Sequence, residues 1–309
     1  MGQDAIQAVK QRIISEEKNV FPQEVAVEST TACNLNCIMC SRNRLTRKFG
    51  QISWDLYKKI VEEIAQKAKE TTRLWLCFFG EPLLRKDLPD MVLHAKQNGL
   101  KNVVINSNMN TLRPGIAEAL VKNGMNTIFA SVDALTSSVY STIRRGGSFE
   151  KVVKNVLEYQ EMLAKYGDSE QQIIVQFIEM EQNSDQKNDV INFWHEYGID
   201  VKIRPLITFQ NSNGIELAIS ELERQPCHWA MNIMPISPFG ECVHCGTDYD
   251  GKKIYGDINY STIEDIWNTT KKELRLIHLN HQWEKLPDFC LNCPDWVSAY
   301  ATYDKMEII

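Results

Sequence analysis

The sequence contains no long hydrophobic run and no block of basic residues. No stretch of 18 consecutive apolar residues occurs, so no transmembrane helix is predicted. The N-terminal residues 1–19 are polar and contain no apolar core of the signal-peptide type. The formal net charge is −6, which argues against nucleic acid as a partner. We therefore expect a cytoplasmic protein that has no membrane and no nucleic-acid partner.

A fourth cysteine is missing from the first cysteine cluster. The stretch ESTTACNLNCIMCSRN contains Cys33, Cys37 and Cys40, with spacings of three and two residues. A structural zinc site uses four ligands, and so does an iron–sulfur cluster that is held by protein alone. Three thiolates leave one metal position open, which predicts that another molecule binds there.

The other cysteines are grouped near the C-terminus. Nine cysteines in a cytoplasmic chain are not expected to form disulfides, and clustered thiols indicate metal or iron–sulfur ligands first. Cys77 lies alone in an apolar run and is expected to be a small buried hydrophobic residue. The remaining five follow residue 226: Cys227, Cys242, Cys245, Cys290 and Cys293.

Strand-like and helix-like segments alternate through the first two thirds of the chain. Buried strands are expected at 24–30, 73–80, 102–108, 127–133, 172–180 and 201–207. Helices are expected between them at 52–70, 87–99, 113–124, 148–167 and 184–198. This alternation predicts an α/β fold with a parallel sheet of right-handed units. Six units are too few for a closed eight-unit barrel, so they suit either a partial six-unit (β/α) barrel or a doubly wound sheet.

The alternation stops near residue 210. The region after it is rich in cysteine, and only one clear helix is expected there, at 261–275. We expect an N-terminal helical extension over 1–23, an α/β domain over 24–220 and a small domain over 221–309. Metal binding is expected to stabilise the small domain.

The C-x3-C-x2-C spacing after the first strand resembles that of the radical S-adenosylmethionine (SAM) superfamily. The resemblance implies a partial barrel in which Cys33, Cys37 and Cys40 hold a [4Fe–4S] cluster, whose open iron binds SAM. Reductive cleavage of SAM would then give a 5′-deoxyadenosyl radical that takes a hydrogen atom from the substrate. A zinc knuckle completed by a distant Cys or His is the alternative.

Further segments resemble the SAM-binding motifs of this superfamily. The turn Gly80-Glu81-Pro82 matches the family's Gly-Gly-Glu-Pro turn except that Phe79 replaces the first glycine. Met39 stands where an aromatic residue often precedes the last cysteine. The resemblance implies that these side chains contact SAM, with Arg144 or Arg145 pairing with its carboxylate: Gly80, Glu81, Pro82, Ser107, Asn108, Ser131, Asp133, Arg144, Arg145 and Leu206.

The C-terminal cysteines resemble those of the SPASM and twitch domains. The resemblance implies one auxiliary [4Fe–4S] cluster held by Cys227, Cys245, Cys290 and Cys293. A Cys₄ zinc site that uses Cys242 in place of Cys227 is the alternative. Cys242 is otherwise left over, either as a packed thiol or as a thiol that faces the barrel mouth.

The resemblance implies hydrogen abstraction from a carbon of a small polar substrate that is similar to a sugar or a cyclitol. Related enzymes include aminocyclitol dehydrogenases and aminoglycoside epimerases. The expected reaction is epimerisation with Cys242 as hydrogen donor, and the alternatives are dehydrogenation through the auxiliary cluster and peptide maturation. A reductant such as flavodoxin or ferredoxin is the expected partner. A non-catalytic zinc or cluster protein is disfavoured by the complete set of SAM motifs.

Overall fold

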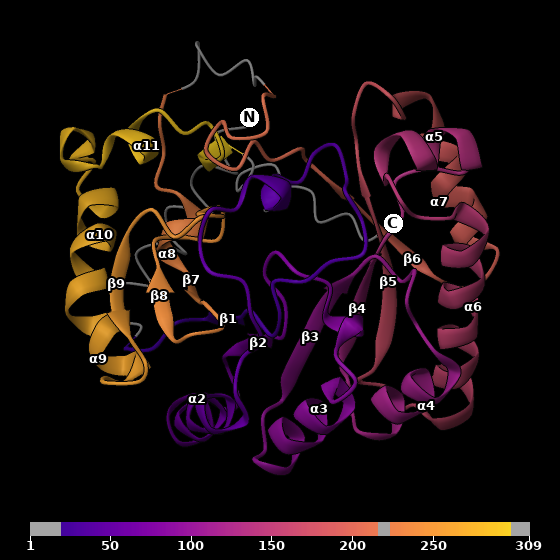
Figure 1. The fold of residues 1–309 in the computed structure, drawn as a ribbon, viewed down its shortest axis with the longest axis horizontal. Helices are drawn as coiled ribbons and strands as arrows, with labels where there is room; N and C mark the ends of the chain where they lie inside the picture. Colours follow the sequence, from indigo (N-terminus) through magenta and orange to yellow (C-terminus); the bar gives the residue numbers. More distant parts are fainter. Residues whose placement is uncertain (1–19, 216–222, 298–309) are drawn as a thin grey trace.

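A computed structural model describes residues 20–215 and 223–297 (Figure 1). The expected helical extension falls almost entirely outside these ranges, and so does the expected domain boundary near residue 220. In the described residues the strands form one nine-stranded sheet in the order β6-β5-β4-β3-β2-β1-β7-β8-β9. The first six are β1 (Glu24–Val27), β2 (Arg73–Trp75), β3 (Asn102–Ser107), β4 (Thr127–Ser131), β5 (Gln172–Ile178) and β6 (Asp200–Arg204).

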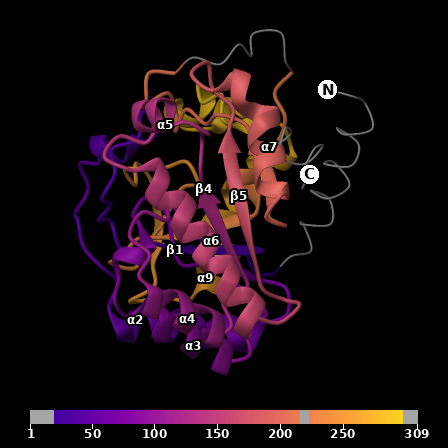
Figure 2. The same ribbon diagram turned by 90° about the vertical axis from the view of Figure 1, so that its right-hand side faces the viewer.

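All neighbouring pairs among these six strands are parallel, as the alternation of strands and helices predicts. Helices connect them and follow one another along the outer face of the sheet (Figures 1 and 2). Ser53 caps the first of these helices, because its side chain accepts a hydrogen bond from the Leu56 N–H at 3.3 Å. The α-helices of this part are α2 (Trp54–Lys67), α3 (Leu88–Gln97), α4 (Pro114–Lys122), α5 (Ser137–Ile143), α6 (Phe149–Tyr166) and α7 (Lys187–His195).

Alternate residues of each strand point to opposite faces of the curved sheet. The outward residues pack against the helices and form the main core, which includes Val25, Leu74 and Val201. The inward residues form a small apolar cluster of Val104, Phe129 and Ile174, against which Trp75 packs. The inner face therefore has a small apolar cluster of its own, and it also carries polar side chains such as Asn106, Lys202 and Arg204.

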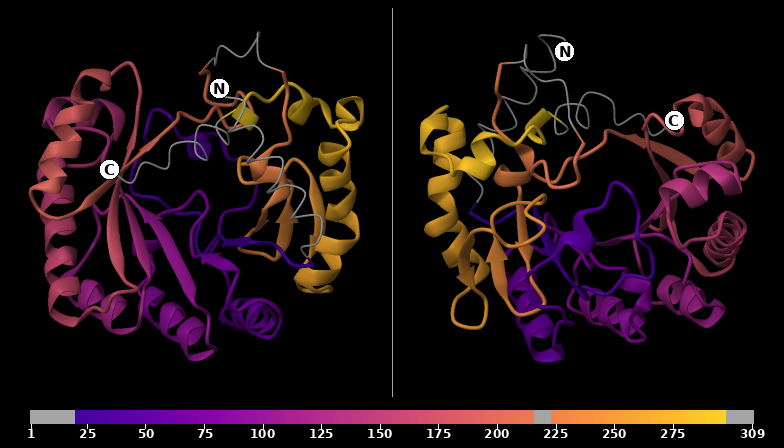
Figure 3. Two further views of the ribbon diagram at one scale, coloured as in Figure 1. Left: turned by 180° about the vertical axis from the view of Figure 1, so that it is seen from behind. Right: turned by 45° about the horizontal axis from the view of Figure 1, so that its top comes forward.

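The C-terminal part contains strands that were not expected. Strand β7 (Ile233–Ile236) pairs in parallel with β1, and β8 (Glu241–Val243) and β9 (Ile254–Asp257) continue the sheet in antiparallel pairs. This part is therefore more regular than the single expected helix suggests, because pairing with β1 orders these short strands. Figure 3 shows β6 on one side of the curved sheet and β7–β9 on the other.

The helix expected at 261–275 is two helices. It is interrupted at Thr269, whose backbone angles of φ −114° and ψ −94° are not helical. The helices of this part are α8 (His228–Met231), α9 (Ile263–Asn268), α10 (Thr270–Leu279) and α11 (Asp288–Leu291). None of the helices that the structure describes is both long enough and apolar enough to cross a membrane.

Candidate active site

The three-cysteine loop begins after β1, at the carboxyl edge of the parallel strands. The thiols of Cys33, Cys37 and Cys40 are partly exposed and lie close enough to interact electrostatically. Burial raises the pKa of Cys40 to about 11, and the neighbouring Cys37 and Cys33 thiols contribute to this shift. The loop is held in place by backbone hydrogen bonds, one of them from Ile38 to Ile143.

A tight turn between β2 and α3 supports this loop. A Cβ atom on Gly80 would lie 1.8 Å from the carbonyl oxygen of Thr30, so only glycine permits the approach. The next residue, Glu81, donates its backbone N–H to the Ala32 carbonyl at 2.8 Å. Pro82 then begins a short 3₁₀ helix. The turn therefore lies directly against the segment that leads to Cys33.

The Glu81 carboxylate connects this turn to the end of β3. It accepts hydrogen bonds from the Leu83 N–H at 3.0 Å, the Ser107 hydroxyl at 2.8 Å and the Asn108 N–H at 2.8 Å. Asn108 in turn donates its side-chain amide to Asn34 at 3.0 Å, within the cysteine loop. Four expected SAM contacts, Gly80, Glu81, Ser107 and Asn108, are therefore joined in one network.

The two candidate arginines occupy different environments. Arg144 is buried and forms an ion pair with Asp133, with 2.5 Å between Nη2 and Oδ2. Its Nη1 lies 3.7 Å from the Cys37 sulfur. Arg145 is exposed, and its carbonyl accepts a hydrogen bond from the Asn36 N–H. The structure thus places Arg144 beside the cysteine loop and leaves Arg145 at the surface.

The remaining expected SAM contacts lie at the ends of two strands. Ser131 is the last residue of β4, and Leu206 follows β6 by two residues. Leu206 packs against an apolar cluster that contains Met39 and Met180. Met39 is buried there, so an apolar surface lies beside the cysteine loop where the superfamily usually has an aromatic residue.

A second group of four thiols forms in the C-terminal part. Cys227, Cys245, Cys290 and Cys293 are all buried. Burial is the largest cause of the raised pKa values of all four thiols, and neighbouring thiols add to the shifts of Cys227, Cys290 and Cys293. Donors surround them, with the Asp295 N–H at 3.4 Å from the Cys293 sulfur and the Arg224 guanidinium at 3.9 Å from the Cys290 sulfur. Among the described residues, no three His, Cys, Asp or Glu side chains are grouped as a site for a single metal ion.

Cys242 is separated from these four thiols. It lies in β8 opposite Ile236 of β7 and belongs to the main core, where its side chain is fully buried. The charges that act on its thiol come from Lys271, Asp257 and Glu63. Of the two alternatives expected for Cys242, the structure agrees with the packed thiol and not with a thiol that faces the barrel mouth, because its register places it on the outer face of the sheet.

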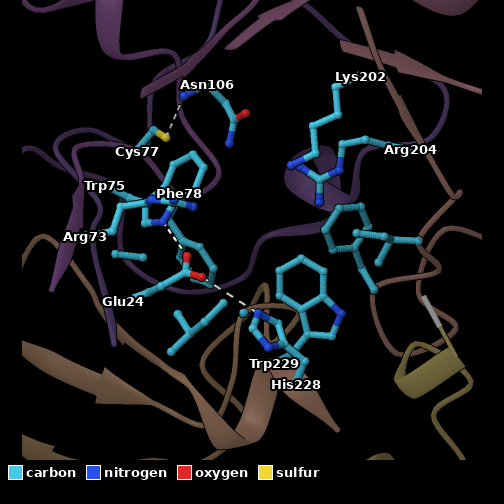
Figure 4. Close-up of a pocket in the computed structure, with 15 residues that line it drawn as sticks. Glu24, Arg73, Trp75, Cys77, Phe78, Asn106, Lys202, Arg204, His228 and Trp229 are labelled. Carbon is cyan, nitrogen blue, oxygen red and sulfur yellow. Dashed lines mark hydrogen bonds and ion pairs between the residues drawn. The ribbon is translucent and has the colours of Figure 1, made fainter. Parts of the chain in front are cut away.

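A cavity of about 370 Å³ lies on the inner face of the sheet (Figure 4). The cavity wall includes residues from the strands and from the C-terminal part: Glu24, Arg73, Trp75, Cys77, Phe78, Asn106, Lys202, Arg204, Phe209, His228, Trp229 and Gly246. The volume is within the usual range for small-molecule sites. Cys77 is buried in the main core, as expected, and it also contributes to this wall, whereas Cys242 does not.

Two family models match this chain. A model of the radical SAM superfamily matches residues 27–175, and a model of the SPASM iron–sulfur cluster-binding domain matches residues 227–294. The chain belongs to the radical SAM superfamily. Its matched segments contain the three-cysteine loop and the four C-terminal thiols, respectively.

Individual relatives agree with this assignment. The probable GTP 3′,8-cyclase of Methanocaldococcus jannaschii is 26% identical over 216 residues, which cover 67% of this chain and 68% of that protein. Several other curated relatives match over about half of their own length or less. These matches therefore do not establish that this chain has the activities of those relatives.

Solved structures show the same fold. BtrN in complex with AdoMet (SAM) and 2-DOIA has a TM-score of 0.62 at 19% identity, with 88% of this chain and 92% of BtrN covered. SuiB of Streptococcus suis bound to its precursor peptide has a TM-score of 0.69 at 14% identity, with 92% of this chain and 72% of SuiB covered. At these identities the likeness concerns the fold alone.

The radical SAM domain uses SAM and a [4Fe–4S] cluster, and the SPASM domain binds auxiliary iron–sulfur clusters. The donor sets fit these groups. Three partly exposed thiols lie together beside the network around Glu81, and four buried thiols lie together in the C-terminal part. Cys33, Cys37 and Cys40 would hold the first cluster.

The cavity residues were not recognised as site residues in this radical SAM sequence, although a signal was present. The expected strand at 201–207 reads VKIRPLI, in which basic and apolar residues alternate. A buried strand with charged residues at every second position indicates a polar inner face. Lys202 and Arg204 could have been found from this pattern.

Proposed function

We propose that this radical SAM enzyme removes a hydrogen atom from a carbon of a small polar substrate in the barrel cavity and releases a dehydrogenated product. The observation that carries this proposal is the position of the cavity beside both the SAM motifs and the C-terminal thiols. Its wall contains residues that directly precede the SAM motifs and residues that directly follow Cys227 and Cys245.

On one side, the cavity wall adjoins the SAM motifs. Cys77 and Phe78 come directly before the Phe79–Pro82 turn, and Asn106 comes directly before Ser107. On the other side, His228 follows Cys227 and Gly246 follows Cys245. A molecule bound in the cavity would therefore adjoin both the SAM site and the auxiliary site.

When bound, SAM and its cluster supply the radical that takes the hydrogen atom, and the auxiliary cluster supplies an electron acceptor. For a secondary alcohol, loss of a hydrogen atom from carbon, a proton from the hydroxyl and one electron leaves a ketone. We assign Glu24 to accept the hydroxyl proton, because its carboxylate lies in the cavity wall. Trp75 orients this carboxylate by donating its indole N–H to Glu24 at 2.5 Å.

Epimerisation is the second candidate, and the thiol that favours it is Cys77. Its sulfur accepts a hydrogen bond from the Asn106 N–H at 3.1 Å, and burial raises the pKa of this thiol to about 12. Cys77 therefore keeps the S–H bond that a hydrogen-atom donor needs. Cys242 is not among the residues of the cavity wall.

The deciding experiment follows the substrate's hydrogen atoms. The protein is reconstituted anaerobically and supplied with SAM and either dithionite or a flavodoxin or ferredoxin system, which are the proposed reductants. Sugars and cyclitols are then screened for release of 5′-deoxyadenosine, with a short peptide panel included because SuiB is a peptide-bound relative.

Dehydrogenation predicts a product that lacks two hydrogen atoms and gains no solvent deuterium at the oxidised carbon. Epimerisation predicts a product of unchanged composition that carries one deuterium when made in D₂O, and Cys77→Ser should then suppress it. Cys242→Ala is the matched control and should leave either product unchanged. Release of 5′-deoxyadenosine only with peptides would contradict the proposal of a small substrate.

A further inference from the structure

Two cationic side chains extend from β6 into the barrel cavity. Lys202 and Arg204 are separated by one residue, so both lie on the inner face, whereas Ile203 between them packs against the main core. Figure 4 shows the two side chains next to each other in the cavity wall. A third cation, Arg73, comes from the start of β2.

These three cations form no ion pair with a carboxylate among the residues that the structure describes. The Lys202 amino group lies 5.2 Å from the centre of the Phe129 ring. Arg204 donates from Nη1 to the side-chain oxygen of Gln176 at 3.2 Å. Within the described chain, the Arg73 Nε atom is buried without a hydrogen-bond partner.

The carboxylate in the same wall makes its direct contacts with other residues, although its charge also acts on Lys202 and Arg204. Glu24 accepts the Trp75 hydrogen bond, and one of its oxygens lies 3.8 Å from the His228 ring. The cavity wall therefore contains three cationic side chains and one carboxylate. Burial lowers the pKa of Lys202 to about 8, and repulsion from Arg204 and Arg73 adds to this effect.

Buried charges in proteins are normally paired, because an unpaired charge loses its hydration without compensation. An anion in the cavity would supply the missing partner. The planar guanidinium of Arg204 suits a carboxylate or a phosphate, and the adjacent Lys202 adds a point charge. The neighbouring Gln176 amide is held by Asn106 at 2.8 Å, which fixes the side chain that contacts Arg204.

We propose that the substrate carries an anionic group, a carboxylate or a phosphate, which binds between Lys202 and Arg204. This inference rests on the proposed function in one respect, namely that the substrate occupies the barrel cavity. It narrows the substrate class from polar sugars and cyclitols to acidic or phosphorylated ones.

The test uses three hexose probes that differ only at carbon 6: glucose, glucose 6-phosphate and glucuronate. Their binding to the reconstituted enzyme with SAM present is measured by calorimetry, with inorganic phosphate as a minimal probe. At least one anionic hexose should bind about tenfold or more tightly than glucose, the effect expected of one charge-assisted hydrogen bond. The phosphate and carboxylate arms identify which anion the site prefers.

Variants locate the binding site. Lys202→Met and Arg204→Met should each weaken the preferred anionic probe about tenfold, whereas Lys202→Arg should retain most of its affinity. Lys151→Met, which removes an exposed lysine of α6, is the matched control and should change nothing. Iron content and circular dichroism report whether each variant is folded.

Three results would overturn the inference. These are equal binding of glucose and its anionic counterparts, unchanged anion affinity in the folded Lys202→Met/Arg204→Met double variant, and no binding of any anionic probe. Release of 5′-deoxyadenosine is measured in parallel, as a test of SAM cleavage that does not depend on anion binding. Anion binding by an enzyme that does not cleave SAM would contradict the proposed function and leave the anion site standing.

Discussion

The carboxylate of Glu81 accepts a hydrogen bond from the backbone N–H of Asn108, with 2.8 Å between the two atoms. This contact joins the turn after β2 to the end of β3, and both segments carry SAM motifs. Because the same carboxylate also accepts hydrogen bonds from Leu83 and Ser107, it holds together the segments that we propose to bind SAM.

We expect Glu81→Ala to impair both stability and SAM binding. Three donors lose their acceptor, and unsatisfied buried groups cost about 1–3 kcal/mol each. Glu81→Gln, which keeps one carbonyl oxygen, should be less destabilised in urea unfolding while still binding SAM more weakly by calorimetry. An Ala variant as stable as the parent would show that these hydrogen bonds contribute little.

Replacing Cys33, Cys37 and Cys40 together with Ala should abolish SAM cleavage. These thiols are the proposed ligands of the SAM-binding cluster, and the C-terminal thiols are far from them in sequence and form a separate group. About half of the iron should therefore remain, as measured by iron analysis and electron paramagnetic resonance. Continued formation of 5′-deoxyadenosine in this variant would refute the ligand assignment.

Cys242 and Cys245 offer a matched pair in one segment. Cys245→Ala should lower the iron bound by the C-terminal part, because its thiol lies with Cys227 and Cys290. Cys242→Ala should keep all of the iron, since that thiol lies in the main core. If the two variants lose iron equally, the separation of Cys242 from the auxiliary site is wrong.

Cys242→Ser should reduce stability without changing iron content. The side chain is fully buried, and a hydroxyl placed there without a partner costs about 1–3 kcal/mol. Chemical denaturation measures the loss, and Cys242→Ala separates it from the loss of the thiol itself.

The affinity for an anionic probe should fall as the pH rises through about 8. The folded pKa of Lys202, about 8, lies below its ordinary value of 10.5, so the unfolded chain binds the extra proton between these values. Below pH 8 the side chain is charged in both states and destabilises the fold, but it attracts an anion. As the pH rises through about 8 the folded side chain loses its charge and its attraction for the anion, and the destabilisation is relieved progressively up to pH 10.5.

Glucuronate is the suitable probe for this profile, because its carboxylate stays charged throughout. Its dissociation constant should rise with pH in the parent enzyme and stay nearly flat in Lys202→Arg, whose guanidinium remains charged. A parent profile as flat as that of the Arg variant would argue against Lys202 as a binding group.

The sequence by itself determined the alternation of six parallel strands with helices, the Ser53 cap and the two groups of cysteines. These features depend on residues close together along the chain: hydrophobic periodicity, a capping side chain, and thiol spacing. The SAM motifs at Gly80–Pro82 and Ser107–Asn108 were recognisable for the same reason. Each lies at a strand end, and parallel strands bring those ends to one edge.

Only the tertiary structure decided which cysteines face the cavity. Cys77 lies in the cavity wall, whereas Cys242 does not, because successive residues of a strand alternate between faces and the register of β8 places Cys242 on the outer face. The register of β8 depends on β7, and the position of β7 depends on its pairing with β1, about 200 residues earlier. No local pattern encodes that pairing, because its free energy comes from contacts that exist only once the sheet has formed.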